Sequence, residues 1–212
     1  SSLDNLHKEK AQNLASKLIY TTDLKEALKG TDFIIEAIPE DKKLKTELYR
    51  TCDELMGPST VLGSSTSGII LTDLVSDLKN RKNFLVVHPM NPPHLIPIVE
   101  LVPTKFTSSK TVEVVNEFFN IMKRKPVKLL KEIDGFVLNR LQCALISEAM
   151  ALVQNGYIEP HDIDNIVTHG LGLRWSILGP FACMDSNSDK GFKDYVEKYG
   201  DLMKNGAQNL LK

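Results

Sequence analysis

The sequence predicts an α/β fold in which a doubly wound sheet is followed by an all-α domain. Two observations lead to this prediction. Between residues 18 and 87, short apolar runs alternate with helix-like stretches, as in the βαβ units of a largely parallel sheet. From residue 135 onward the pattern is helical, without a convincing strand. We therefore place a boundary near residue 131, with a sheet domain over 1–131 and a helical domain over 132–212.

Helix caps, prolines and apolar runs define the individual elements. Thr22 and Asp23 are residue types that begin helices, and Gly30 would end the helix that they begin. Pro39 stops the apolar strand DFIIEAI, and Gly57-Pro58 ends the helix after it. The expected helices are residues 4–16, 24–30, 41–56, 72–78 and 135–156, and the expected strands are 18–20, 32–38, 60–64 and 84–87.

Composition argues against several function classes. The 212 residues are 42% hydrophobic and carry 26 Lys and Arg against 27 Asp and Glu, so no basic field favours nucleic acid or an anionic membrane. Cys52, Cys143 and Cys183 form no C-x-x-C pair, so neither a disulfide framework nor a zinc site is indicated. A protein of a reducing compartment fits this pattern best. The polar start, with no 18-residue apolar run in the chain, adds to the expectation of a cytoplasmic protein.

Residues 84–100, FLVVHPMNPPHLIPIVE, contain the clearest catalytic pattern. One apolar run leads to His88, and a second run after a proline-rich turn leads to Glu100. Two short strands joined in this way bring an imidazole and a carboxylate side by side, which is the arrangement that orients a general base. The alternative is that His88 caps a strand while Glu100 lies in solvent, and these residues alone leave both interpretations open.

Polar residues follow the other expected strands as well. Glu40 comes after strand 32–38, Ser67 after strand 60–64, Asn91 shortly after His88, and Asn139 lies at the start of the long helix. Doubly wound sheets bind ligands at the carboxyl ends of their strands. Each residue taken alone has a plain structural explanation, as a loop residue or a satisfied hydrogen-bonding group. Their joint occurrence favours a ligand site.

Four motifs resemble those of a known family and occur in its order: TDFIIEAIPEDKKLK, SSTSGI, VVHPMNPPHLIPIVELVP and GFVLNRLQ. They are similar to the 3-hydroxyacyl-CoA dehydrogenase superfamily, and within it to the branch of λ-crystallin and L-gulonate 3-dehydrogenase. The resemblance runs over residues 18–200. It implies a Rossmann-like sheet with a helical domain, and NAD-dependent oxidation of a 3-hydroxyl group.

The resemblance also implies the roles of the catalytic residues. His88 would be the general base, because an imidazole titrates near neutral pH. Glu100 would hold the other ring nitrogen and stabilise the imidazolium. Ser67 and Asn139 would hydrogen-bond the substrate oxygen as it passes from alcohol to carbonyl.

Cofactor contacts are implied in the same way. Glu40 and Lys45 match positions around the nicotinamide ribose of NAD, one turn of helix apart on the same side. Asn91 matches a position near both the substrate and the nicotinamide, and Ser67 would also border the cofactor.

Arg174 carries the indication of substrate. It lies in GLGLRWSILGP, where acyl-CoA enzymes of the superfamily tend to have Gly-Tyr-Pro-Met-Gly-Pro, and a similar arginine occurs in gulonate and carnitine dehydrogenases. A guanidinium offers two parallel donors to a carboxylate, so Arg174 would anchor a small free 3-hydroxy acid rather than a thioester. The alternative is a surface arginine lying over Trp175.

The Gly-rich turn of the superfamily, G-x-G-x-x-G, does not occur in this sequence. That turn and the helix behind it hold the pyrophosphate. We therefore expect an N-terminally truncated Rossmann-like sheet that binds NAD weakly by itself. Three functions stay open: a 3-hydroxy acid dehydrogenase of the L-gulonate type, an L-3-hydroxyacyl-CoA dehydrogenase, and a catalytically silent, crystallin-like structural or interaction protein.

The protein partner that we expect is a second copy of the same chain. The long helix between Gly135 and Gly156 has apolar residues around more of its circumference than a helix that packs on one face only would need. Part of this surface is therefore available to a second subunit. The superfamily's dimers are built from the helical domain, so the resemblance implies a homodimer through this helix and its neighbours.

Overall fold

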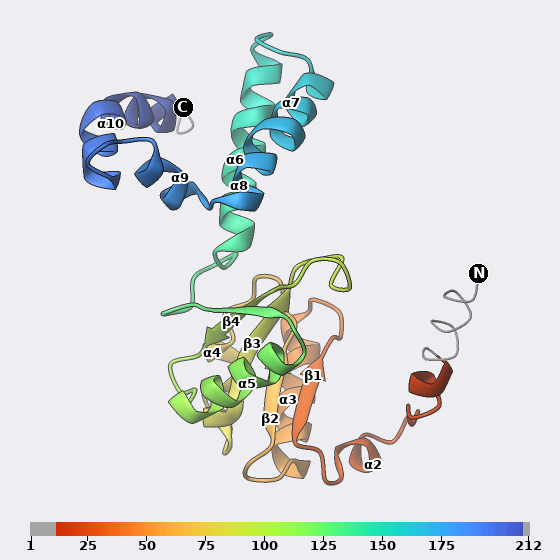
Figure 1. Cartoon of the computed structure of the whole chain (residues 1–212). Helices are drawn as coiled ribbons and strands as arrows, with labels where there is room; N and C mark the ends of the chain where they lie inside the picture. Colours follow the sequence, from red (N-terminus) through yellow and green to blue (C-terminus); the bar gives the residue numbers. More distant parts are fainter. Residues whose placement is uncertain (1–11, 210–212) are drawn as a thin grey trace. The chain divides into compact units, whose positions relative to one another are not determined.

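The computed structural model describes residues 12–209, and contacts within the chain divide it into two units after Val137 (Figure 1). Most of the helix expected over residues 4–16 lies outside the described residues, of which 12–15 are helical. Phe136, which the boundary near residue 131 assigns to the helical domain, is buried in the core of the sheet unit.

The sheet unit is built on five strands in the order β1-β2-β3-β4-β5. The first three are parallel, β4 is antiparallel to β3, and β5 is parallel to β4. The carboxyl ends of β1, β2 and β3 therefore meet the amino end of β4 at one edge. The strands are β1 (Phe33–Glu36), β2 (Val61–Ser64), β3 (Phe84–Pro89), β4 (Ile98–Pro103) and β5 (Lys125–Lys128).

Side-chain caps begin the main helices of this unit. Asp23 accepts hydrogen bonds from the backbone N–H groups of Lys25 and Glu26, which confirms the helix start predicted there. Asp41 and Ser108 cap α3 and α5 in the same way. The helices are α2 (Leu24–Leu28), α3 (Lys42–Leu55), α4 (Thr72–Val75) and α5 (Ser109–Ile121), with a 3₁₀ turn η1 (Arg81–Asn83) before β3.

Two parts of the sheet unit differ from the sequence prediction. The strand predicted over residues 18–20 is wrong: these residues form no strand, and Ile19 is 89% exposed, because no neighbouring strand pairs with them. Helix α5 and strand β5 were not anticipated. The sequence of β5, KPVK, is short and charged at both ends, so apolar periodicity does not reveal it.

Two hydrophobic clusters lie on opposite faces of the sheet, as in a doubly wound fold. Along β3, Val86 points into the cluster shared with α3 and α4, whereas Leu85 and Val87 point into the cluster shared with α5. This alternation follows from the period of two in a pleated strand. Gly63 lies beneath Val87 in the second cluster, where a Cβ atom would come within 2.7 Å of Val87 Cγ2.

The helical unit consists of short helices after one long helix. The long helix predicted over residues 135–156 is present but begins at Leu138, because Gly135 and Phe136 have positive φ angles. Pro160 and Pro180 lie in the first turns of α7 and α9, where proline is tolerated. The elements are α6 (Leu138–Gln154), α7 (Pro160–Ile166), a π-helix η2 (Val167–Leu171), α8 (Gly172–Ile177), α9 (Pro180–Ser186) and α10 (Phe192–Asn209).

Among residues 12–209, no helix combines the length and the apolar character that crossing a bilayer requires.

Gly63→Ala tests the close approach of β2 and β3. The added methyl would press on Val87 and on the ring of Phe33, so we expect the free energy of unfolding to fall by about 1–3 kcal/mol. Urea denaturation measures this change. Gly68→Ala is the matched control, because the nearest atom to its added Cβ would lie 4.0 Å away. Equal unfolding midpoints for the two variants would contradict this account of the packing.

Candidate active site

The candidate site begins with a buried pair, His88 on β3 and Glu100 on β4. The two residues face each other directly in the antiparallel register, and His88 Nδ1 lies 2.9 Å from Glu100 Oε2. His88 is 7% exposed and Glu100 is 4% exposed, so Glu100 is not solvated as the alternative interpretation required. With the Nδ1 proton donated to the carboxylate, the lone pair of the imidazole is on Nε2. This is the geometry of an oriented base.

Glu100 is held on its second oxygen as well. Glu100 Oε1 accepts a hydrogen bond of 3.0 Å from the backbone N–H of Val137. The ring of Phe136 packs on the imidazole of His88, with 5.4 Å between the ring centroids. The pair therefore sits in a fixed and largely dry environment, which strengthens a charge-assisted hydrogen bond.

A second polar cluster lies on the same face of the sheet, at the carboxyl ends of β1 and β2. Glu36 Oε1 accepts from Lys45 Nζ at 2.7 Å, and Glu36 Oε2 accepts from the hydroxyls of Tyr49 and Ser64 at 2.5 and 2.7 Å. Lys45 is only 1% exposed although it carries a charge. The cluster is a buried ion pair whose remaining acceptor sites are also satisfied.

Sequence reasoning missed Glu36, Tyr49 and Ser64, although the chain contains a signal for them. Along each inner strand, the residue two positions after a core residue again points into the same face. Ile34 is followed in this phase by Glu36, and Leu62 by Ser64. On α3, Lys45 and Tyr49 are four residues apart and share the buried helix face.

The environment of this cluster changes the ionisation of its members. Burial by itself would raise the pKa of Glu36, but hydrogen bonds from the ammonium, two hydroxyls and a backbone N–H outweigh it and hold the pKa below its ordinary value. Burial, followed by the Glu36 carboxylate, raises the pKa of Tyr49 well above its usual range. The same two causes raise the pKa of Cys52 to about 11, so its thiol stays protonated and unreactive at neutral pH.

Glu40 connects the buried cluster to the loop that contains Ser67. Glu40 Oε2 lies 3.5 Å from Lys45 Nζ, while Glu40 Oε1 accepts from the hydroxyl of Thr66 and, at 3.1 Å, from the backbone N–H of Ser67. The Glu40 side chain is about half exposed and Ser67 is exposed. The structure thus brings Glu40, Lys45 and Ser67 together at the carboxyl edge of the sheet.

Three further residues were named from the sequence, one in the sheet unit and two in the helical unit. Asn91 is exposed in the loop between β3 and β4. Asn139 is partly buried in the first turn of α6, and Arg174 is exposed on α8, both in the helical unit. Within the sheet unit the structure therefore joins Glu40, Lys45 and Ser67 in one group and His88 and Glu100 in another. Asn139 and Arg174 belong to the helical unit.

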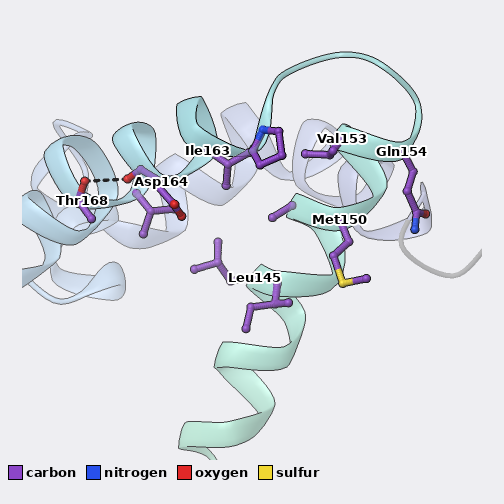
Figure 2. Close-up of a pocket in the computed structure, with 11 residues that line it drawn as sticks. Leu145, Met150, Val153, Gln154, Ile163, Asp164 and Thr168 are labelled. Carbon is purple, nitrogen blue, oxygen red and sulfur yellow. Dashed lines mark hydrogen bonds between the residues drawn. The ribbon is translucent and has the colours of Figure 1, made fainter. Parts of the chain in front are cut away.

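The helical unit has a cavity of its own, of ≈ 520 Å³ (Figure 2). Leu145, Met150 and Val153 of α6 face Ile163 of α7 across it, and the lining is mostly apolar. Asp164 and Thr168 provide polar atoms, and the Thr168 hydroxyl donates to the backbone carbonyl of Asp164. None of the site residues predicted from the sequence is among the lining residues.

Residues 12–209 contain no group of three or more His, Cys, Asp or Glu side chains arranged to hold a metal ion.

Two family models match the chain, one for each part. The NAD-binding domain of 3-hydroxyacyl-CoA dehydrogenase matches residues 2–133, and the C-terminal domain of the same family matches residues 135–211. These matches bear out the resemblance that the four motifs indicated.

Individual relatives agree with this assignment. Lambda-crystallin of Oryctolagus cuniculus is 40% identical over 92% of this chain and 60% of its own length. L-carnitine dehydrogenase of Oceanobacillus iheyensis is 35% identical over 88% of this chain and 61% of its own length. A crystal structure of an NAD⁺-dependent dismutase, 5-formyl-3-hydroxy-2-methylpyridine 4-carboxylic acid 5-dehydrogenase, superposes with a TM-score of 0.80 and 34% identity over 87% of this chain and 59% of that chain.

The chain thus spans about 60% of the length of the curated relatives that it matches. One family model covers more than half of the chain, and the second begins two residues after the first ends. The order of the two models is also the order of the sheet unit and the helical unit. The chain therefore belongs to the 3-hydroxyacyl-CoA dehydrogenase family.

Proposed function

We propose that this chain carries the catalytic centre of an NAD-dependent dehydrogenase, which oxidises the 3-hydroxyl of a small free 3-hydroxy acid of the L-gulonate type to the 3-keto acid. The observation that supports the proposal most directly is the buried, register-paired contact between His88 and Glu100. An imidazole fixed in this way can accept the proton of an alcohol as a general base.

In the proposed reaction, the two hydrogens of the CH–OH group leave to different acceptors, one as a proton and one as a hydride. His88 Nε2 takes the hydroxyl proton, and the imidazolium that forms is stabilised by the carboxylate of Glu100 across the Nδ1 hydrogen bond. NAD, when bound, supplies the acceptor for the hydride that leaves the same carbon. Ser67 and Asn139 are proposed to hydrogen-bond the substrate oxygen as it becomes a carbonyl, and Asn91 to border the substrate and the nicotinamide.

The described residues fit the nicotinamide ribose part of NAD. Glu40 is half exposed beside the exposed Ser67 loop, so its carboxylate can accept hydrogen bonds from ribose hydroxyls. Lys45 lies beneath Glu40 and reaches the same carboxylate. Within residues 12–209 no G-x-G-x-x-G turn precedes a helix, so the residues that would hold the pyrophosphate are not among those described.

A free acid is favoured as the substrate for two reasons. The guanidinium of Arg174 is exposed on α8 and can form two parallel hydrogen bonds with a carboxylate. Carnitine and the pyridine carboxylic acid, which name two of the similar dehydrogenases, are free acids. The second candidate is an L-3-hydroxyacyl-CoA substrate, which the family description supports. The third is a crystallin-like structural or interaction role, which the name of the rabbit relative supports.

We also propose a homodimer formed through the helical unit and a cytoplasmic location. Helices α6, α7 and α8 contain no buried residue among those described, and Met150 is 56% exposed beside the apolar cavity (Figure 2). A second copy would remove this apolar surface from water. The cytoplasmic location is supported by the three cysteines, all of which are free thiols.

Glu100→Gln tests the catalytic pair. The amide keeps the shape of the side chain but cannot stabilise an imidazolium by charge, so we expect kcat to fall about 10²- to 10⁴-fold. Steady-state formation of NADH from L-gulonate measures it. Glu113→Gln, an exposed glutamate on α5, is the control and should leave kcat unchanged. An unchanged kcat in Glu100→Gln would rule out this role for the pair.

Arg174→Ala tests the preference for a free acid. Loss of a charge-assisted pair with the substrate carboxylate should raise KM for L-gulonate about 10- to 100-fold, with a smaller change in kcat. Arg50→Ala serves as control, because Arg50 forms a surface pair with Asp77 in the sheet unit. Turnover of a 3-hydroxyacyl-CoA without turnover of the free acid would favour the second candidate. A folded chain that turns over neither substrate would favour the structural role.

Met150→Glu tests the dimer. A carboxylate in the apolar surface of α6 should shift the sedimentation coefficient from that of a dimer to that of a monomer in sedimentation velocity. Ile121→Glu is the control, because Ile121 is 75% exposed on α5 of the sheet unit and should not affect association. A wild-type chain that sediments as a monomer at every concentration would refute the dimer.

A further inference from the structure

The segment between β5 and α6 is tied to the sheet unit at several points. The backbone N–H of Leu129 donates to the carbonyl of Leu101 at 2.9 Å. The carboxylate of Glu132 accepts from the backbone N–H of Thr72 at 2.9 Å and also from the Thr72 hydroxyl. These anchors fix the path of the chain as it passes the catalytic pair.

The backbone conformation at the end of this segment is unusual. Gly135 has a φ of 70° and Phe136 a φ of 50°, so both are left-handed. A glycine adopts this conformation freely, but a phenylalanine is rarely found there. Such a residue persists where its surroundings determine its position, and it is commonly found at functional sites. The backbone N–H of the next residue, Val137, donates to Glu100 Oε1.

The Phe136 ring contributes separately from its backbone. It is fully buried and lies at an angle of 59° to the imidazole of His88, with 5.4 Å between the ring centroids. The aromatic ring therefore packs against the imidazole, which is itself only 7% exposed. Packing in the hydrophobic core alone would account for the burial of the ring. It would not account for a left-handed phenylalanine followed by an N–H bonded to the carboxylate of the pair.

We infer that Phe136 is a positioning residue for the His88–Glu100 pair. Its ring holds the imidazole in place, and its left-handed backbone directs the Val137 N–H onto Glu100, so both oxygens of the carboxylate have fixed partners. Phe136 contacts His88, the proposed base, and acts through it. The catalytic meaning of this inference rests on the proposed function, whereas the positioning itself is measurable without turnover.

Nuclear magnetic resonance of the ¹⁵N-labelled 212-residue chain provides the test. The Nδ1 proton of His88 that is donated to Glu100 is identified by its loss in His88→Asn. In Phe136→Leu, water reaches the pair more often, and we expect exchange of this proton with solvent to accelerate on the order of tenfold. Where the chain turns over L-gulonate, the same variant should lower kcat by a similar factor and leave KM within about twofold.

Phe84→Leu is the matched control. Phe84 is also fully buried in the same hydrophobic cluster, but its aromatic contact is with Tyr49 rather than with His88. It should leave the exchange rate of the His88 proton within about twofold of wild type. If Phe136→Leu does not fold, Phe136→Met, which fills a similar volume, replaces it in the same comparison.

Two results would overturn the inference: an unchanged exchange rate in the Phe136 variant, or an equal acceleration in Phe84→Leu, which would indicate core packing alone. Absence of the Nδ1 proton signal from the wild-type chain would also overturn it. Failure of the proposed function would give a different result. The wild-type chain would then show the protected proton, and Phe136→Leu would still accelerate its exchange, but the chain would oxidise no 3-hydroxy acid.

Discussion

The reversal of chain direction between β3 and β4 is the constraint on which the rest of the site depends. Had β4 run parallel to β3, its amino end would lie at the opposite edge of the sheet, and its third residue could not face His88. Because β4 is antiparallel, the chain turns at the carboxyl edge and Glu100 meets His88 two pairs from the turn. The pleat then places both side chains on the face that holds Val86, Val102 and Phe136. The proposed catalytic pair thus follows from strand direction and register before any loop is considered.

Burying charge at this edge is tolerated because every partner is present. Glu36 and Glu100 are both nearly inaccessible to water, and each has hydrogen-bond donors on both carboxylate oxygens. Among the described residues, no buried side-chain nitrogen or oxygen lacks a hydrogen-bond partner. A buried ion pair of this kind adds little net stability, since desolvation offsets the attraction, but loss of one partner leaves a costly charge behind. The clusters therefore favour one arrangement of the carboxyl edge over looser alternatives.

The sequence allowed much of the sheet to be predicted, and less of the polar site. Strands β1, β2 and β3 are continuous apolar runs, and α3 has a capping Asp41 and a terminal Gly57-Pro58, so local patterns were sufficient. His88 and Glu100 were predictable because a short antiparallel connection joins them. Glu36, Tyr49 and Ser64 were missed because their partners lie 13 to 28 residues away and only the folded sheet brings them together. The roles of Asn139 and Arg174 came from the family resemblance, since no local pattern defines them.

The two units differ in how much of their apolar surface they bury within themselves. The sheet unit buries large side chains on both faces of its sheet and holds the His88–Glu100 pair with its own residues, including Phe136 and Val137. In the helical unit, the described residues of α6, α7 and α8 leave all their apolar side chains at least partly exposed. Apolar surface of this extent is unfavourable in water unless further packing covers it. In the function proposed above, chemistry and substrate choice would then depend on different parts of the chain. The base depends on the register of one sheet, and the proposed Arg174 contact depends on how the apolar surface of the helical unit is covered.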